Sequence, residues 1–140
     1  MGDAEANPNG PHPPARVPNR NRHVLTRVRR KTRRKRRNAV VDSTVDMAVD
    51  IEAINRGEGI RVGEHWTVHR RTYHVDATGH AWPVSSPGVY VLDRAAFLAL
   101  GIYNEDGLSD VAEALLDLER IGAAARSEAR KVWRAGRNVR

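Results

Sequence analysis

Four of the six histidines lie between residues 65 and 80. Apolar and polar residues alternate around His65 and His74, and this period of two is typical of half-buried strands. A turn at Arg70-Arg71 joins these strands and places His65 opposite Asp76, with His74 one pair away, on the polar face. Metal-free RNA cleavage needs two imidazoles and a carboxylate, because one ring removes the 2′-hydroxyl proton and another protonates the leaving oxygen. His65, His74 and Asp76 are therefore candidate catalytic residues.

The histidine face allows other interpretations as well. Arg70 or Arg71 could stabilise phosphate charge in such a reaction, and His65, His74 and Asp76 could instead bind zinc. The sequence has no metal-ligand spacing motif, and histidine and threonine are ordinary residues on the wet face of a sheet. We therefore expect no metal and no cofactor. We favour a non-enzymatic protein and keep a small ribonuclease or toxin-like effector as the alternative.

The strands that carry these histidines predict a three-stranded antiparallel meander. The turn at Arg70-Arg71 pairs Trp66 with Val75 on the apolar face. A third strand over residues 80–84 follows a turn at Thr78-Gly79 and sets Trp82 beside Val75. A one-residue slip would expose large apolar side chains, so this register is favoured over its neighbours.

Helices are predicted on both sides of the meander. Asp42 or Ser43 caps a helix that runs to about Asn55. Three more helices follow the sheet, over residues 94–100, 109–120 and 123–135, with Gly101 closing the first of them. The expected core stripe of the middle one is Val111, Ala114, Leu115 and Leu118. The predicted fold class is thus α+β: an N-terminal helix, a three-stranded antiparallel meander and three C-terminal helices.

The run from Arg27 to Arg37 is the strongest functional signal, because nine of its eleven residues are Lys or Arg. Guanidinium groups bind phosphate oxygens and stay charged at any working pH. No aromatic residue interrupts the run, so it predicts contact with the phosphate backbone and no sequence readout. The same composition also occurs in targeting tracts. The predicted nucleic-acid-binding residues of the run are Arg27, Arg29, Arg30, Lys31, Arg33, Arg34, Lys35, Arg36 and Arg37.

The last helix adds a second basic stripe. Arg126, Arg130 and Arg134 recur every four residues, and we predict that they help to bind nucleic acid. With the preceding helix they could form a helix-turn-helix reader. The alternative, which we favour, is a surface helix anchored by Trp133.

Composition divides the chain into regions. Residues 1–41 carry 12 basic and 2 acidic side chains, residues 42–122 carry 6 and 14, and residues 123–140 carry 6 and 1. Residues 1–38 are rich in Pro and Arg and poor in aliphatic side chains, which predicts a disordered arm. The predicted organisation is therefore an arm over 1–38, an α+β domain over 39–136 and a basic tail over 137–140. The acidic middle could bind the arm itself or recruit a basic protein.

The chain has no cysteine and no apolar stretch long enough to span a bilayer. We therefore expect no disulfide, no membrane partner and a cytoplasmic location, at the nucleoid or on RNA if the source is bacterial. The leading hypothesis is sequence-independent binding of the DNA or RNA phosphate backbone. An enzyme using the histidine face and an adaptor that binds proteins are the alternatives.

The stretch Trp82-Pro-Val-Ser-Ser-Pro-Gly-Val-Tyr-Val-Leu-Asp-Arg-Ala-Ala-Phe-Leu-Ala-Leu-Gly-Ile-Tyr-Asn104 resembles a segment of small uncharacterised bacterial proteins, some of them associated with mobile elements. The resemblance extends from about Ile51 to Trp133 and leaves out the basic run. It implies a bacterial or phage source and brings no activity or site residues with it.

Overall fold

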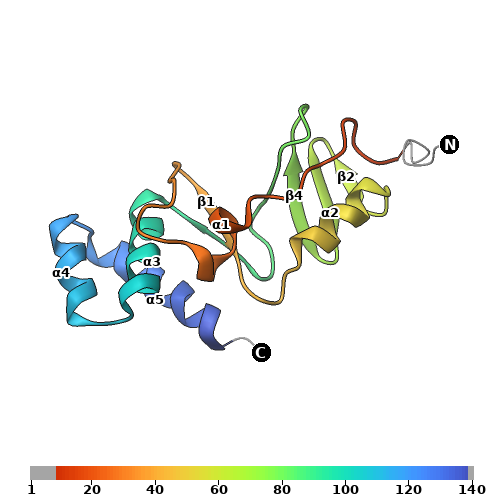
Figure 1. Ribbon diagram of the computed structural model, residues 1–140. Coiled ribbons are helices and arrows are strands. Elements are labelled where there is room, and N and C mark those ends of the chain that lie inside the picture. Colours follow the sequence, from red (N-terminus) through yellow and green to blue (C-terminus); the bar gives the residue numbers. More distant parts are fainter. Residues whose placement is uncertain (1–8, 139–140) are drawn as a thin grey trace. The chain divides into compact units, whose positions relative to one another are not determined.

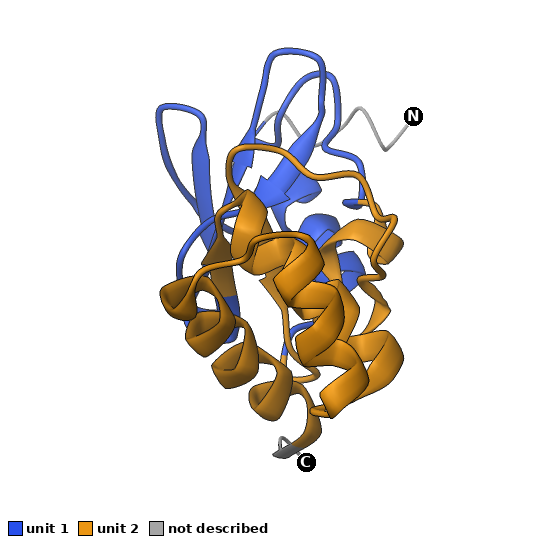
Figure 2. Cartoon of the chain, turned by 90° about the vertical axis from the view of Figure 1, so that its left-hand side faces the viewer, with its two compact units in different colours: residues 1–18, 45–89 blue, residues 19–44, 90–140 orange. Residues whose placement is uncertain are grey.

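The computed structural model describes residues 9–138 and confirms the α+β class (Figure 1). The chain divides into two compact units (Figure 2). Unit 1 comprises residues 1–18 and 45–89, and unit 2 comprises residues 19–44 and 90–140. Among the helices of the described residues, none is both long enough and apolar enough to cross a membrane.

Unit 1 is a four-stranded antiparallel sheet with one helix. Its elements are α2 (Met47–Asn55), β2 (Ile60–Val62), β3 (His65–Val68), β4 (Arg71–Val75) and β5 (Ala81–Pro83), and the strand order is β2-β3-β4-β5. The sequence predicts only the last three of these strands. Alternation along β3 and β4 buries Trp66, Val68, Tyr73 and Val75, and this apolar face is the predicted one.

The predicted register of the hairpin is wrong by two residues. Trp66 pairs with Tyr73, not with Val75, because the turn consists of His69 and Arg70, whose φ angles are 51° and 68°. Two successive positive φ angles are characteristic of a tight type I′ hairpin turn, which usually carries Asn-Gly. A shift of two residues keeps every side chain on its predicted face but changes its partner across the strands.

Helix α2 begins later than predicted, and its buried side includes a charged residue. Asp42 does not cap it, because its carboxylate accepts hydrogen bonds from the backbone and side chain of Thr44. Asp46 is the cap and accepts from the amide of Val49 at 3.2 Å. The buried side of α2 includes Asp50, whereas Val49 is 49% exposed.

Unit 2 combines a two-stranded sheet with five helical segments. Its elements are α1 (Arg20–His23), the 3-10 helix η2 (Leu25–Arg27), β1 (Asn38–Val41), β6 (Val89–Leu92, whose first residue belongs to unit 1), α3 (Arg94–Asp106), α4 (Asp110–Leu118) and α5 (Ala123–Asn138). Strand β1 pairs with β6. Its four residues are all buried, so it lacks the alternation by which half-buried strands are predicted.

The expected disorder of residues 1–38 is wrong for the residues around the start of the basic run. Leu25 and Val28 are fully buried in the same core as Phe97 and Leu100 of α3. Two large aliphatic side chains within a basic segment therefore find a shared core with helices far along the sequence. Residues 1–8 of the predicted arm lie outside the described residues. The predicted boundaries of an independently folding domain, at 39 and 136, stay a prediction.

The predicted core stripe of the 109–120 helix is also only partly correct. In α4, Ala112 and Leu116 are buried, while Val111 is 60% and Leu118 77% exposed. Leu115 packs at the edge of the core. Ala114 is exposed as well, so the buried stripe is shifted by one residue along the sequence from the predicted one, which turns it by about 100° around the helix.

Gly101 does not close a helix as predicted but lies inside α3, where the chain approaches closely. A Cβ atom at this position would lie 2.4 Å from the carbonyl oxygen of Arg29. The side chain of Leu25 meets α5 at a second glycine, because a Cβ at Gly136 would lie 2.2 Å from its Cδ1 atom. Both helices thus have glycine where the segment around residues 25–30 packs against them.

Replacing Gly101 with alanine tests this packing by the sign of its effect. In an exposed helix the change stabilises by up to about 1 kcal/mol, but here we expect a loss of about 1–3 kcal/mol because the Cβ collides with the backbone of Arg29. Gly122→Ala is the matched control, since its Cβ would meet nothing within 4 Å. Urea unfolding followed by circular dichroism measures both. Stabilisation by Gly101→Ala would show that residues 25–30 do not pack on α3.

Candidate nucleic-acid interface

The basic run forms an exposed loop between η2 and β1. Of its nine cationic side chains, eight are exposed and Arg30 is half-buried. The run therefore faces solvent as predicted, but between two fixed ends rather than on a free arm. We call residues 27–37 the basic loop.

The first end of the basic loop is held by burial and by one asparagine. Leu25 and Val28 are 0% exposed. Asn104 of α3 donates from its Nδ2 atom to the carbonyl oxygens of both residues, at 2.8 and 2.9 Å. These contacts satisfy backbone acceptors that a short 3-10 turn leaves unpaired.

The second end is held by Asn38, which is 1% exposed. Its Nδ2 atom donates to the carbonyl oxygens of Lys35, at 2.7 Å, and Leu92, at 3.2 Å. Its Oδ1 atom accepts from the amide of Lys35 at 2.8 Å and from the guanidinium of Arg22 at 3.1 Å. One buried amide thus ties the end of the basic loop to β6, and this position carried no signal in the sequence.

Acidic groups of the same unit contact the basic loop at one residue. The amide of Arg30 donates to the carboxylate of Glu105, and its guanidinium lies 3.6 Å from the carboxylate of Glu119. The two side chains of this ion pair are 41% and 40% exposed, so the pair contributes little to stability. The arm predicted to fold back onto the acidic middle of the chain does contact it at this point.

The predicted stripe on the last helix is largely engaged within unit 2. Arg126 forms ion pairs with Glu113 at 3.0 Å and with Asp117 at 2.8 Å. Arg130 donates to the hydroxyl of Tyr103 at 3.1 Å. Of the three predicted binding residues of α5, Arg134 is the exposed one. A helix-turn-helix reader needs a free recognition face, and these contacts do not favour one.

The end of α5 brings another cation to the basic loop. The guanidinium of Arg137 lies 3.9 Å above the ring of Trp133 and donates to Asn104 at 3.3 Å. Burial and the nearby charge of Arg29 lower the pKa of Arg137. Like charges held close to each other form a field that attracts anions.

The structure brings His65 and His74 together in unit 1, whereas the carboxylate of Asp76 bonds to the turn that follows β4. His65 pairs directly with His74 across β3 and β4, and the centroids of the two rings are 5.0 Å apart. Asp76 instead accepts from the amide and hydroxyl of Thr78 and from the amide of His80. These hydrogen bonds, with the Thr78 hydroxyl first, lower the pKa of Asp76. The predicted pairing of His65 with Asp76 is therefore wrong.

Two residues that the sequence did not assign to this face complete it. Trp82 pairs with His74, not beside Val75 as predicted, and the two rings are stacked at 4.3 Å with planes 9° apart. The carboxylate of Glu64 lies 2.8 Å from Nε2 of His74. Within residues 9–138, no group of three or more His, Cys, Asp or Glu side chains is arranged to hold a metal ion.

A buried carboxylate lies on the opposite face of the same sheet. Asp50 of α2 is 0% exposed and accepts from the guanidinium of Arg71 at 2.6 and 2.8 Å, from the hydroxyl of Tyr73 at 2.6 Å and from Nδ1 of His69 at 2.7 Å. Burial acts to raise the pKa of Asp50, but these hydrogen bonds outweigh it and lower the pKa. Burial and Asp50 together raise the pKa of Tyr73. Arg71 is thus committed to Asp50 and does not serve the histidine face.

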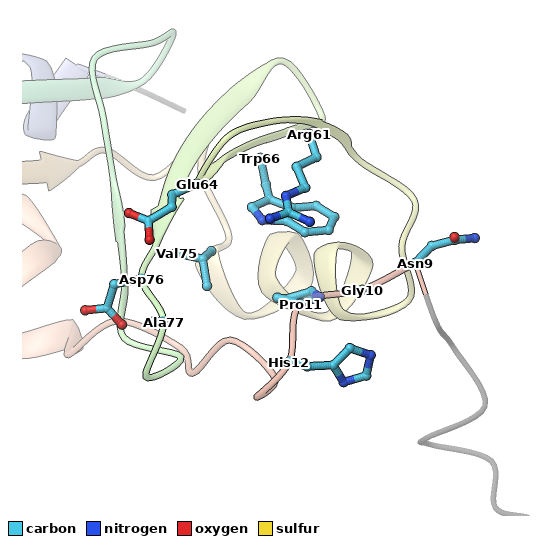
Figure 3. A pocket seen from close by; sticks show the side chains of 10 residues that line it. All are labelled: Asn9, Gly10, Pro11, His12, Arg61, Glu64, Trp66, Val75, Asp76 and Ala77. Atoms are coloured by element: carbon cyan, nitrogen blue, oxygen red, sulfur yellow. The ribbon is translucent and has the colours of Figure 1, made fainter.

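A cavity of about 380 Å³ opens near the start of β3. Its walls include Trp66, Arg61 and Glu64, together with residues 9–12 of the N-terminal segment (Figure 3). The guanidinium of Arg61 lies over the ring of Trp66, 5.6 Å from its centroid. Glu64 thus both lines this cavity and contacts His74.

Comparison of the chain with protein-family models, with curated proteins and with solved structures finds no match.

Proposed function

We propose that the protein binds nucleic acid through the phosphate backbone, with the basic loop as its main contact. The observation that carries this proposal is the exposure of eight cationic side chains on a loop whose two ends are fixed by Leu25, Val28 and Asn38. Fixing the ends lowers the conformational entropy that the loop loses on binding, compared with a free arm. Arginine-rich surfaces of this kind bind phosphates by charge and by paired hydrogen bonds.

The distribution of charge between the units supports the same proposal. Unit 2 has 19 basic and 9 acidic residues, whereas unit 1 has 5 basic and 8 acidic residues. The basic excess therefore belongs to the unit that holds the basic loop. Arg134 and Arg137 of α5 extend the positive charge of this unit, and Arg126 and Arg130 mainly stabilise its helices.

A comparison of unrelated sequences tests the proposal. Contacts to phosphate carry no sequence information, so we expect gel retardation of several 20-base-pair DNA duplexes at equal salt to give dissociation constants within about threefold of each other. RNA duplexes and single strands serve as further probes of the shared phosphate chemistry. A preference of 100-fold or more for one duplex would contradict backbone binding, and the absence of retardation at low salt would reject the function.

A further inference from the structure

Three side chains that can transfer protons lie close together in unit 1. They are those of His65, His74 and Glu64. We propose that they form a metal-free site that cleaves RNA by transesterification, with His65 as the base and His74 as the acid. This inference rests on the proposed function only in that RNA must reach the protein. The predicted role of Asp76 passes to Glu64, whose carboxylate is the one that contacts His74.

The arrangement of the rings favours proton transfer over base stacking. Trp82 lies parallel to His74 at 4.3 Å, which is close to the spacing between neighbouring strands. The two rings therefore stand side by side across the sheet, and Trp82 covers one face of the His74 ring. A nucleobase cannot stack on the covered face, so the nitrogen atoms of the His74 ring are the groups through which it can act.

Glu64 distinguishes the two histidines. Its carboxylate lies 2.8 Å from Nε2 of His74, so a proton on that atom is held there and the pair becomes an ion pair when the ring is protonated. The second nitrogen of the protonated ring, Nδ1, then donates its proton to a leaving oxygen. His65 is exposed and contacts His74 edge to face, which leaves it able to accept a proton as a neutral ring. Glu64 is thus a positioning residue.

The reaction is balanced without another reactant. His65 accepts the proton of a ribose 2′-hydroxyl, and the 2′-oxygen forms a bond to the adjacent phosphorus. The bond from phosphorus to the 5′-oxygen breaks, and that oxygen receives the proton from Nδ1 of His74. The products are a 2′,3′-cyclic phosphate and a free 5′-hydroxyl. The two rings have then exchanged protonation states, and exchange with water restores them.

The cavity beside Glu64 offers a place for part of the substrate. Its volume of about 380 Å³ lies in the range of small-ligand pockets and is enough for a nucleoside. Trp66 and Val75 of the apolar face line it, and it adjoins the histidine face at Glu64 (Figure 3).

A labelled oligodeoxynucleotide that contains one ribonucleotide tests the proposal, with protein in excess and EDTA present. We expect cleavage on the 3′ side of that ribonucleotide, with a cyclic phosphate at the new end. Versions with 2′-deoxy or 2′-O-methyl at this position should stay intact, because they lack the attacking hydroxyl. His65→Gln and His74→Gln should each lower the single-turnover rate constant about 100-fold or more.

Two variants separate chemistry from folding. His80→Gln removes a neighbouring ring, 5.1 Å from Trp82, and should leave the rate unchanged. Glu64→Gln keeps an acceptor oxygen and removes the charge, so the rate constant should fall while the half-saturating protein concentration stays the same. Circular dichroism confirms the fold of each variant.

Retardation of the same oligonucleotide separates this proposal from the binding function. Retarded but uncleaved substrate with folded wild-type protein would overturn the cleavage proposal alone. Equal cleavage by wild type and both histidine variants would also overturn it. Cleavage without retardation would reject backbone binding as the main function and leave the catalytic site standing.

Discussion

Asp50→Ala is expected to lower the free energy of unfolding of unit 1 by about 3–5 kcal/mol, because it leaves the guanidinium of Arg71, whose side chain is only 16% exposed, without its carboxylate. The carboxylate accepts four hydrogen bonds from three side chains, and all three come from β4 or the turn before it. Asp50 therefore joins α2 to the hairpin that carries His65 and His74. Urea unfolding in a Trp133→Phe background measures the effect, because the remaining tryptophans, Trp66 and Trp82, both lie in unit 1.

Glu52→Ala on the same helix is the control. Glu52 is exposed and its ion pair with Arg56 spans 3.4 Å. Loss of this ion pair should therefore lower the free energy of unfolding by less than about 0.5 kcal/mol. A cost below about 1 kcal/mol for Asp50→Ala would contradict the role assigned to Asp50. Because the pKa of Asp50 is lowered in the folded protein, its contribution is complete above about pH 4 and is lost as the pH falls through the folded pKa. Asp50→Asn should therefore make unfolding less sensitive to acid.

Replacing Arg33, Arg34, Lys35, Arg36 and Arg37 together with glutamine is expected to weaken nucleic-acid binding by about 10²–10⁴-fold at 0.1 M salt. Each cation that contacts a phosphate releases about 0.9 counterions from a duplex, so five contacts account for several powers of ten in affinity. All five side chains are exposed, so their replacement should leave the fold intact. Gel retardation with a 20-base-pair duplex and with an RNA strand measures the loss.

The matched control removes exposed charges from the other unit. Arg56, Arg61 and Arg70 of unit 1 are exposed, and replacing them with glutamine lowers the net charge by three. The control removes three charges and the loop variant removes five. If net charge alone governed binding, the loss of affinity of the control, in powers of ten, would therefore be more than half of the loss of the loop variant. We expect a change of less than about tenfold, and a larger loss would show that the basic loop is not the main contact.

The faces of the hairpin were predictable from the sequence, and its register was not. Alternation placed Trp66 and Tyr73 inside and both histidines outside, because a period of two survives any shift by an even number of residues. The register depends on a two-residue turn with positive φ, and His69-Arg70 lacks the Asn-Gly type of sequence that indicates one. The pairing of His65 with His74, and the exclusion of Asp76, therefore became visible only in the structure.

The docking of the basic segment illustrates a different limit. Composition predicts disorder for residues 1–38 because it averages over the segment. Leu25 and Val28 contribute little to the average composition of the segment, but both are fully buried. The glycines that leave space for their segment lie far along the sequence, at positions 101 and 136. Such complementarity between distant positions carries no local signal. The same holds for Asp50, whose charge alone predicts a solvent-exposed side of α2.

The slope of the logarithm of the binding constant against the logarithm of salt concentration tests the central claim most directly. Measured with one DNA duplex between 50 and 300 mM salt, the wild-type slope should be steep and negative, and the five-glutamine loop variant should have a slope smaller in magnitude by about 4–5. The unit 1 control variant should keep the wild-type slope to within about 1. Equal slopes for the wild type and the loop variant would contradict the claim that the basic loop binds the phosphate backbone.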